Sequence, residues 1–191
     1  MKVKLPDADI DYIENFYSPA ESEMLFHELT QNIAWRHDDI TMFGKTMKIP
    51  RLQAWYSDDD LSYRYSDMTL TSKPFTSPLA KIKKQVSDYC QDEFNAVLAN
   101  LYRNQRDSVG WHSDDETELG TNPVIASLSF GAARDFQLKH INTNEKLSLR
   151  LASGSLLIMR GKTQHFWQHC IPKRSKEIAP RVNLTFRKIL F

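Results

Sequence analysis

The sequence predicts a mainly β fold with flanking helices (α+β), either a jelly roll or a β-sandwich. Three observations support this prediction. A chain of 191 residues suits one domain with a full core. Two helix signals occur in its first half, and short strand-like segments separated by turn-forming residues fill its second half. We find no internal repeat and no Gly- or Ser-rich linker, so we expect a single domain over residues 1–191.

The two helix signals combine a capping sequence with a proline near the first helical position. Ser18-Pro19-Ala20-Glu21 offers an N-cap and a capping box, so the first helix is expected to run to about Asn32. The second helix is expected to begin at Ser77-Pro78 and to end near Asp92. Its apolar residues recur at helical spacing: Leu79, Ile82, Val86 and Tyr89.

The chain after this second helix has the composition of β-strands broken by turns. Residues up to about 95 are expected to form an N-terminal extension that holds both helices, and residues from about 96 to 191 a strand-rich core. The expected strands cover residues 96–102, 124–130, 135–140, 146–151, 155–159, 165–170 and 181–186.

The composition is that of a water-soluble globular protein, with 41% hydrophobic and 26% charged residues. No segment has the apolar length needed to span a bilayer, and the N-terminus lacks the apolar core of a signal peptide. We therefore expect a cytoplasmic protein, nuclear if the source is a eukaryote, with no membrane partner. Cys90 and Cys170 are expected to be buried free thiols, because a lone disulfide is rare in such proteins.

Charge is distributed unevenly along the chain, although the net charge is only +1. Residues 1–138 carry 14 Lys and Arg against 22 Asp and Glu, whereas residues 139–191 carry 11 against 2. A basic C-terminal third suits a polyanionic partner or a small dicarboxylate, although such segments are more often solvated surfaces.

A His-x-Asp pair, His112 and Asp114, is the first chemical signal. Residues two apart on an extended chain point the same way, so both side chains can reach one metal ion. Two histidines and one carboxylate on one side of iron leave positions open for a co-substrate and dioxygen. The third ligand is expected to be His169, with His165 as the competitor, and a hydrogen-bonded core position is the alternative for either. Hydrogen-bonded core positions are expected for His27, His37 and His140.

Residues 181–187 give a second signal, because polar and apolar residues alternate along them. Strand geometry separates the backbones of Arg181 and Arg187 by roughly 20 Å, so their side chains can bracket a short dicarboxylate. The alternative, structural ion pairs, requires buried acids that the C-terminal third almost lacks. Asn183 and Thr185 share the polar face of this segment, and Asn100 and Tyr102 share a face of the segment 96–102.

These segments, in their order and spacing, resemble the core of the AlkB family of iron(II)- and 2-oxoglutarate-dependent dioxygenases. The resemblance covers the chain from about Asp39 to the C-terminus. It rests on Asn100-Leu101-Tyr102, Trp111-His112-Ser113-Asp114-Asp115-Glu116, residues 125–132 and 154–159, His169 and residues 180–187, with residues 50–56 resembling part of a substrate-recognition lid.

The resemblance implies a double-stranded β-helix, or jelly roll, with an N-terminal substrate-recognition lid. It implies that His112, Asp114 and His169 bind Fe(II), with Arg181 on the far carboxylate of 2-oxoglutarate and Arg187 nearer the metal. The full set of residues that it places around 2-oxoglutarate is Asn100, Tyr102, Arg181, Asn183, Thr185 and Arg187.

The reaction that the resemblance implies is oxidative dealkylation of N-alkylated bases in DNA or RNA. Dioxygen and 2-oxoglutarate are consumed, an N-alkyl carbon is hydroxylated, and the unstable product releases an aldehyde, with succinate and carbon dioxide as by-products. A base in a duplex must first leave the stack. The expected partner is alkylated DNA or RNA, and the protein is expected to act as a monomer.

The resemblance also singles out residues that would contact the substrate. Phe43-Gly44-Lys45 resembles a finger that fills the vacated space in a family member acting on duplex DNA. Tyr63 and Tyr65 resemble a wall of the base pocket, although Arg64 between them departs from the small residue expected there. Glu116 resembles an acidic residue that contacts the base. The alternative for these residues is an ordinary hairpin tip, lid core and exposed surface.

Two other functions remain open at this point. A dioxygenase of the same fold that acts on a protein or a small molecule would keep every iron and co-substrate residue. Phe43 and the tyrosine pair instead favour a flat substrate that can be stacked upon. A non-catalytic jelly-roll binding module has no need for a metal triad beside two interior arginines.

Overall fold

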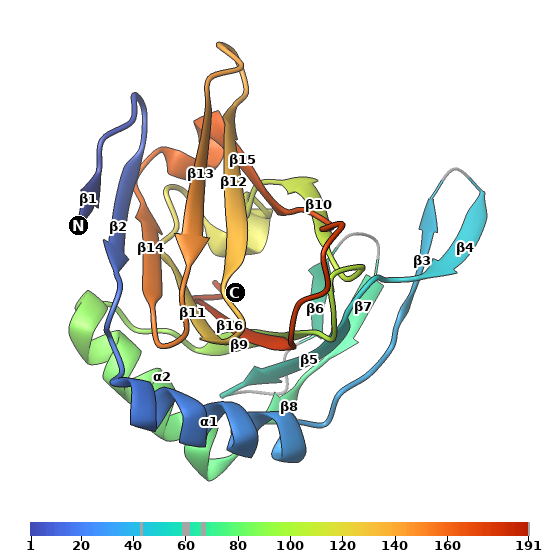
Figure 1. Cartoon of the computed structure of the whole chain (residues 1–191). Coiled ribbons are helices and arrows are strands. Elements are labelled where there is room, and N and C mark those ends of the chain that lie inside the picture. Colours follow the sequence, from blue (N-terminus) through green and yellow to red (C-terminus); the bar gives the residue numbers. More distant parts are fainter. Residues whose placement is uncertain (43, 59–61, 66–67, 191) are drawn as a thin grey trace.

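The computed structural model describes residues 1–42, 44–58, 62–65 and 68–190, and within them the chain forms two facing β-sheets (Figure 1). This mainly β arrangement is the predicted jelly roll. The larger sheet contains, in order, β1 (Lys2–Val3), β2 (Asp9–Ile13), β14 (Leu156–Arg160), β11 (Ile125–Gly131), β16 (Arg181–Arg187), β9 (Ala96–Tyr102), β5 (Leu52–Ser57) and β8 (Lys73–Pro74). The smaller sheet contains β10 (Val109–His112), β15 (Trp167–Ile171), β12 (Arg134–His140) and β13 (Lys146–Leu151).

Two helices cover the outer face of the larger sheet (Figure 1). Helix α1 (Pro19–Asn32) begins with the predicted capping box, in which Ser18 and Glu21 each accept a hydrogen bond from the other's backbone N–H. Helix α2 (Ser77–Cys90) ends two residues before the predicted Asp92, because Gln91 adopts a left-handed conformation with φ 52°. Both predicted helices are therefore confirmed, apart from that shorter end.

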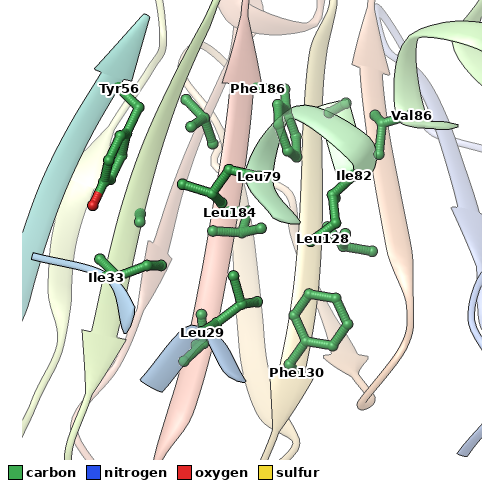
Figure 2. Packing of buried hydrophobic residues seen from close by; sticks show 14 of the residues in the cluster. Leu29, Ile33, Tyr56, Leu79, Ile82, Val86, Leu128, Phe130, Leu184 and Phe186 are labelled. Carbon is green, nitrogen blue, oxygen red and sulfur yellow. The ribbon is translucent and has the colours of Figure 1, made fainter. Parts of the chain in front are cut away.

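The contact between the helices and the sheet is a closely packed apolar layer (Figure 2). Leu29 from α1 and Leu79 and Ile82 from α2 pack with side chains of β11 and β16, among them Leu184 and Phe186. Each such side chain, when fully buried, stabilises the fold by roughly 1.5–3 kcal/mol. The apolar face of β16 is thus committed to the helices, and its polar face must point to the smaller sheet.

A second apolar cluster fills most of the space between the two sheets. Leu138 and Trp167 of the smaller sheet pack with Leu98 and Leu157 of the larger sheet. The polar faces of β16 and β9 border this same space, so that the interior between the sheets is apolar on one side and polar on the other. This polar region is where a ligand would lie.

All seven predicted strands are found within two residues of their expected ends. The largest difference is at residues 165–170, where the short helix α3 (Thr163–Phe166) takes the first two residues and β15 begins at Trp167. The part of residues 50–56 in a substrate-recognition lid stays a prediction. Most of them form β5, which pairs with β9 inside the larger sheet. A boundary near residue 95 stays a prediction.

Two hairpins stand apart from the main sheets. The first joins β3 (Asp39–Met42) to β4 (Lys45–Lys48) and projects from the body of the molecule (Figure 1). The second joins β6 (Ser62–Tyr65) to β7 (Met68–Thr71). None of the helices in the described part of the chain has the length and hydropathy needed to cross a membrane. Cys90 and Cys170 are free thiols, as predicted, although Cys90 is only half-buried.

Candidate metal centre and its cavity

Three side chains, from two neighbouring strands and the segment that follows one of them, meet at one point between the sheets. His112 is the last residue of β10, Asp114 follows it by two positions, and His169 lies on β15 directly opposite His112. One donor atom from each lies within 4.8 Å of the others. The structure thus brings together the three residues singled out in the sequence and selects His169 over His165.

The two imidazoles are held in place by their neighbours. His112 Nδ1 lies 2.8 Å from the carbonyl oxygen of Gly110. Because a carbonyl can only accept, Nδ1 carries the proton and Nε2 keeps the lone pair that a metal requires. The ring of His169 stacks on Phe136, with centroids 5.0 Å apart. Each ring is thereby restrained in orientation before any ion binds.

Asp114 is ionised and the histidines are neutral, which is the protonation state that metal binding requires. Burial raises the pKa of Asp114, but Arg187 and the two histidines outweigh it and lower that pKa to about 2. Burial and His112 lower the pKa of His169 to about 3. Burial also lowers the pKa of His112. The group therefore needs to release no proton near neutral pH when it binds a cation.

The predicted co-substrate residues line the same cavity as the metal group. Strands β16 and β9 are paired in register, so their polar faces form one continuous wall. The wall begins beside Asp114, where Arg187 Nη2 donates a 2.6 Å hydrogen bond to Oδ1, and it ends at Arg181. The predicted residues on this wall are Asn100, Tyr102, Arg181, Asn183, Thr185 and Arg187.

Arg181 is a buried cation whose surroundings suit the binding of an anion. It is 1% exposed, and its Nη2 donates to Ser129 Oγ at 2.8 Å. Its Nε and Nη1 atoms are buried without a hydrogen-bond acceptor among the described residues. Burial lowers the pKa of Arg181 to about 10, while Tyr102 acts in the opposite direction. A buried cation of this kind is costly unless a negative charge lies beside it.

The other polar residues of the wall form a connected network. Asn183 Nδ2 donates to Ser127 Oγ at 2.9 Å, and Thr185 Oγ1 donates to Asn183 Oδ1 at 3.0 Å. On the neighbouring strand, the ring of Tyr102 lies 5.3 Å from the Arg181 guanidinium carbon. The network fixes the orientation of these groups, leaving Arg181 and Arg187 as the charged ends of the wall.

Sequence reasoning missed two residues that belong to this site. Arg51 precedes β5 and lines the cavity, and its Nε donates to Asn100 Oδ1 at 2.8 Å. Gln164 of α3 accepts a hydrogen bond from the backbone N–H of Asp114 at 2.9 Å. Arg51 stood in the quoted lid segment and Gln164 beside the candidate ligands, but neither has a spacing that reveals such a contact.

The remaining candidates lie elsewhere. His165 is exposed and its Nε2 is 3.1 Å from Asn122 Oδ1. Glu116 follows Asp114 by two residues and caps a short 3₁₀ helix (Thr117–Leu119), outside the residues that line the cavity. Gly44, with φ 74°, and the exposed Lys45 belong to the β3–β4 hairpin. Tyr63 and Tyr65 belong to β6, and Phe43 lies outside the described residues.

The residues present fit a metal ion and a small dicarboxylate. Two neutral imidazoles and one carboxylate on one side form a donor set that suits Fe(II) and leaves other positions open. The guanidinium of Arg181 lies in the same cavity, and its unsatisfied Nε and Nη1 atoms can donate hydrogen bonds to a carboxylate. Both requirements arise from the chain's own buried groups.

Comparison with known proteins agrees with this chemistry. A sequence profile of the 2OG-Fe(II) oxygenase superfamily matches residues 9–187. The DNA oxidative demethylase ALKBH2 of Mus musculus is 42% identical over 185 residues, covering 91% of this chain and 77% of that protein. The Alpha-ketoglutarate-dependent dioxygenase alkB homolog 3 of Bos taurus is 40% identical over 184 residues, covering 91% of this chain and 64% of that protein.

A solved structure supports the fold independently. The structure of OsALKBH1 superimposes with a TM-score of 0.68 at 19% identity, covering 98% of this chain and all of that one. At 19% identity this structural similarity supports only the assignment of the jelly-roll fold. The sequence matches go further: the chain belongs to the 2OG-Fe(II) oxygenase superfamily and, within it, to the AlkB type of dioxygenase.

Proposed function

We propose that this protein removes alkyl groups from N-alkylated bases in DNA, using Fe(II), 2-oxoglutarate and dioxygen. The proposal rests mainly on one cavity that holds both groups of residues. His112, Asp114 and His169 lie at one end of its polar wall, and Arg181, buried with unsatisfied hydrogen-bond donors, lies at the other. DNA is the proposed substrate because the relatives named as DNA oxidative demethylases match most of the chain.

Iron and 2-oxoglutarate, when bound, supply the oxidant that inserts one oxygen atom of O₂ into a C–H bond of the alkyl group. The other oxygen atom enters succinate as 2-oxoglutarate loses carbon dioxide. The hydroxylated N-alkyl carbon then leaves as an aldehyde, and its hydroxyl proton passes to the base nitrogen. The remaining tasks fall to the chain, which must hold the metal, orient the co-substrate and admit the base.

In this proposal His112, Asp114 and His169 hold the metal. Arg187, hydrogen-bonded to Asp114, keeps that carboxylate ionised and turned into the cavity. Arg181 binds the far carboxylate of 2-oxoglutarate through the Nε and Nη1 atoms that have no acceptor among the described residues. The neutral donors of the wall complete the co-substrate site: Asn100, Tyr102, Asn183 and Thr185.

The substrate side of the cavity is proposed to involve the two hairpins. Gly44 and Lys45 belong to the projecting β3–β4 hairpin, a suitable position for a finger that enters a duplex, and Phe43, which precedes them in the sequence, is proposed as the residue that fills the gap. Tyr63, Tyr65 and Glu116 are proposed to contact the displaced base. Phosphate contacts are proposed for six basic residues: Lys45, Lys48, Lys73, Lys173, Arg174 and Lys176. Two of them have a carboxylate partner already, because Lys48 pairs with Asp39 and Arg174 with Asp135.

The remaining expectations are also proposals. RNA is a second possible substrate, because an N-alkylated base presents the same flat face in either nucleic acid. We propose that the protein acts as a monomer, and that it works in the cytoplasm, or in the nucleus if the source is a eukaryote. A protein or small-molecule substrate is less favoured, since the relatives above are named for DNA.

The test is aldehyde release from N-methylated oligonucleotides with Fe(II), ascorbate and 2-oxoglutarate. Single-stranded DNA, duplex DNA and matched RNA form three arms, and an N-methylated peptide forms a fourth. We expect release from DNA that requires 2-oxoglutarate and is matched by succinate. Release from the peptide alone would contradict a nucleic-acid substrate, and metal binding without any release would leave the dioxygenase site intact but reject base dealkylation.

A further inference from the structure

Gln164 links the two segments that supply the metal ligands. Because Asp114 lies beyond the end of β10, its backbone N–H donates to a side chain, the Oε1 of Gln164, at 2.9 Å. Gln164 is 1% exposed and lies on α3, five residues before His169. We propose that Gln164 is a positioning residue: through the Asp114 backbone it fixes the direction in which the carboxylate faces the two imidazoles. This inference rests on the metal site of the proposed function.

The acceptor oxygen of Gln164 is held by a rigid frame. The hydroxyl of Thr163, the first residue of α3, accepts from Asp9 N at 2.9 Å and donates to Arg160 O at 2.6 Å. Trp167, which follows α3, is completely buried and donates from Nε1 to Pro6 O at 2.9 Å. The helix is therefore fixed at both ends. The hydrogen bond from Asp114 N–H to Gln164 consequently holds the Asp114 backbone in place.

A second tether joins the same two segments. Ser113, between His112 and Asp114, donates from Oγ to the carbonyl oxygen of Trp167 at 3.1 Å. The other end of the Gln164 amide is also engaged, because its Nε2 donates to the Met159 sulfur at 3.5 Å. The Gln164 side chain thus has one defined orientation, with its oxygen turned to Asp114.

Asp114 needs the restraint from Gln164 because Arg187 by itself attracts the carboxylate toward the guanidinium and away from the imidazoles. Arg187 Nη2 lies 2.6 Å from Oδ1, whereas His169 Nε2 lies 3.8 Å from Oδ2. With a free backbone, the carboxylate can turn further toward the guanidinium and away from the imidazoles. Outer partners of metal ligands typically change metal affinity 10–100-fold when they are lost.

The experiment compares two substitutions of similar length in the full-length protein. Gln164→Met keeps the length but removes the strong acceptor, whereas Gln164→Glu keeps an acceptor oxygen. Co(II) alone is titrated into the metal-free protein, and both the dissociation constant and the visible absorption spectrum are recorded. We expect Gln164→Met to bind Co(II) about 10–100-fold more weakly with an altered spectrum, and Gln164→Glu to stay within a few-fold of the wild type.

The matched control is Gln85→Leu on α2. Gln85 accepts a 2.5 Å hydrogen bond from Tyr17, on the helix side of the larger sheet, so this change removes a glutamine acceptor away from the metal. We expect its Co(II) affinity and spectrum to match the wild type. Far-UV circular dichroism and the urea midpoint of each metal-free variant show whether it is folded, and Gln164→Asn replaces Gln164→Met if the latter does not fold.

Each outcome has one meaning. Equal Co(II) affinity in the wild type and in Gln164→Met would overturn the positioning role while leaving the proposed metal site intact. Equal loss in Gln164→Met and Gln164→Glu would also overturn it, because the acceptor oxygen would then be irrelevant. A wild type that binds no Co(II) would reject the proposed metal site itself, and the inference with it.

Discussion

Arg187 Nη2 lies 2.6 Å from Asp114 Oδ1, and both side chains are almost completely buried. The two residues are 73 positions apart in the sequence, on β16 and just after β10. Their pairing joins the larger sheet to the metal group of the smaller one. It also distinguishes Arg187 from Arg181, which forms no ion pair with a carboxylate in the described residues.

This difference predicts opposite stability effects for the two arginines. Arg187→Met leaves the buried Asp114 carboxylate without its counter-ion and is expected to destabilise the metal-free protein by roughly 3–5 kcal/mol. Urea unfolding of the metal-free protein measures this loss. Adding Co(II) should restore part of it, because the cation replaces the missing positive charge. An unchanged urea midpoint would contradict the role of Arg187 as counter-ion.

Arg181→Gln is expected to leave the ligand-free protein as stable as the wild type or more stable, since it removes a buried cation that lacks a carboxylate. The same change should raise the KM for 2-oxoglutarate at least 30-fold, which corresponds to a loss of about 2 kcal/mol. Succinate release at varied 2-oxoglutarate concentration measures this. A destabilised protein with an unchanged KM would assign Arg181 to the fold instead.

A pair of histidine variants tests the choice of the third metal ligand. His169→Ala should abolish Co(II) binding, because it removes one of the three donors. His165→Ala, four residues earlier in the chain, should bind Co(II) as the wild type does, since this exposed side chain points toward Asn122. Isothermal titration of Co(II) into each metal-free variant distinguishes them. Comparable losses in both would mean that the metal group includes His165.

Much of this site follows from the sequence because its residues lie on regular strands. The alternation in residues 181–187 and the pair Asn100 and Tyr102 point to one interior face, and the structure places all of them on that face. Strand periodicity cannot reveal contacts made by irregular segments. Residues 165–170 look like a continuous strand, yet the first two belong to α3, whose first residue, Thr163, is hydrogen-bonded to Asp9 of β2 and Arg160 of β14.

The same limit explains Arg51 and β5. The apolar run after Arg51 is compatible with a lid or with a sheet strand, since only the distant β9 decides which it becomes. Arg51 reaches the cavity through Asn100, 49 residues away. Gln164 is similar, because its partner Asp114 lies 50 residues earlier. Local sequence patterns therefore predict the strands. The contacts of residues outside the strands, such as Arg51 and Gln164, depend on pairing between distant segments and cannot be predicted in this way.

The metal-free protein is expected to lose stability as the pH falls below about 6.5. Burial and His112 lower the pKa of His169 from 6.5 to about 3 in the fold, so the unfolded chain binds the proton first. The contribution of neutral His169 to the free energy of unfolding is complete above pH 6.5. It is lost as the pH falls toward 3, at no more than about 1.4 kcal/mol per pH unit. Asp114, with its pKa near 2, adds a loss of the same sign below pH 3.8.

Urea unfolding at pH 7, 6 and 5 tests this, with His169→Asn as the matched variant. Asparagine is uncharged throughout this range, so the pH dependence of the variant should be flatter than that of the wild type. Parallel curves for the two proteins would show that another group is responsible.

The last prediction concerns Phe43, which resembles the finger residue of a family member that acts on duplex DNA. Phe43→Ala is expected to weaken dealkylation of duplex DNA at least ten-fold while changing activity on single-stranded DNA less than two-fold, because only the duplex leaves a gap in the stack to be filled. Met47→Ala is the control, since Met47 is an exposed apolar residue on β4, close to Phe43 in the sequence. Aldehyde release at matched lesion concentration measures both variants on both substrates. Equal losses on single-stranded and duplex DNA would refute a finger role, and equal effects of the two variants would mean that the hairpin contributes through its general apolar surface.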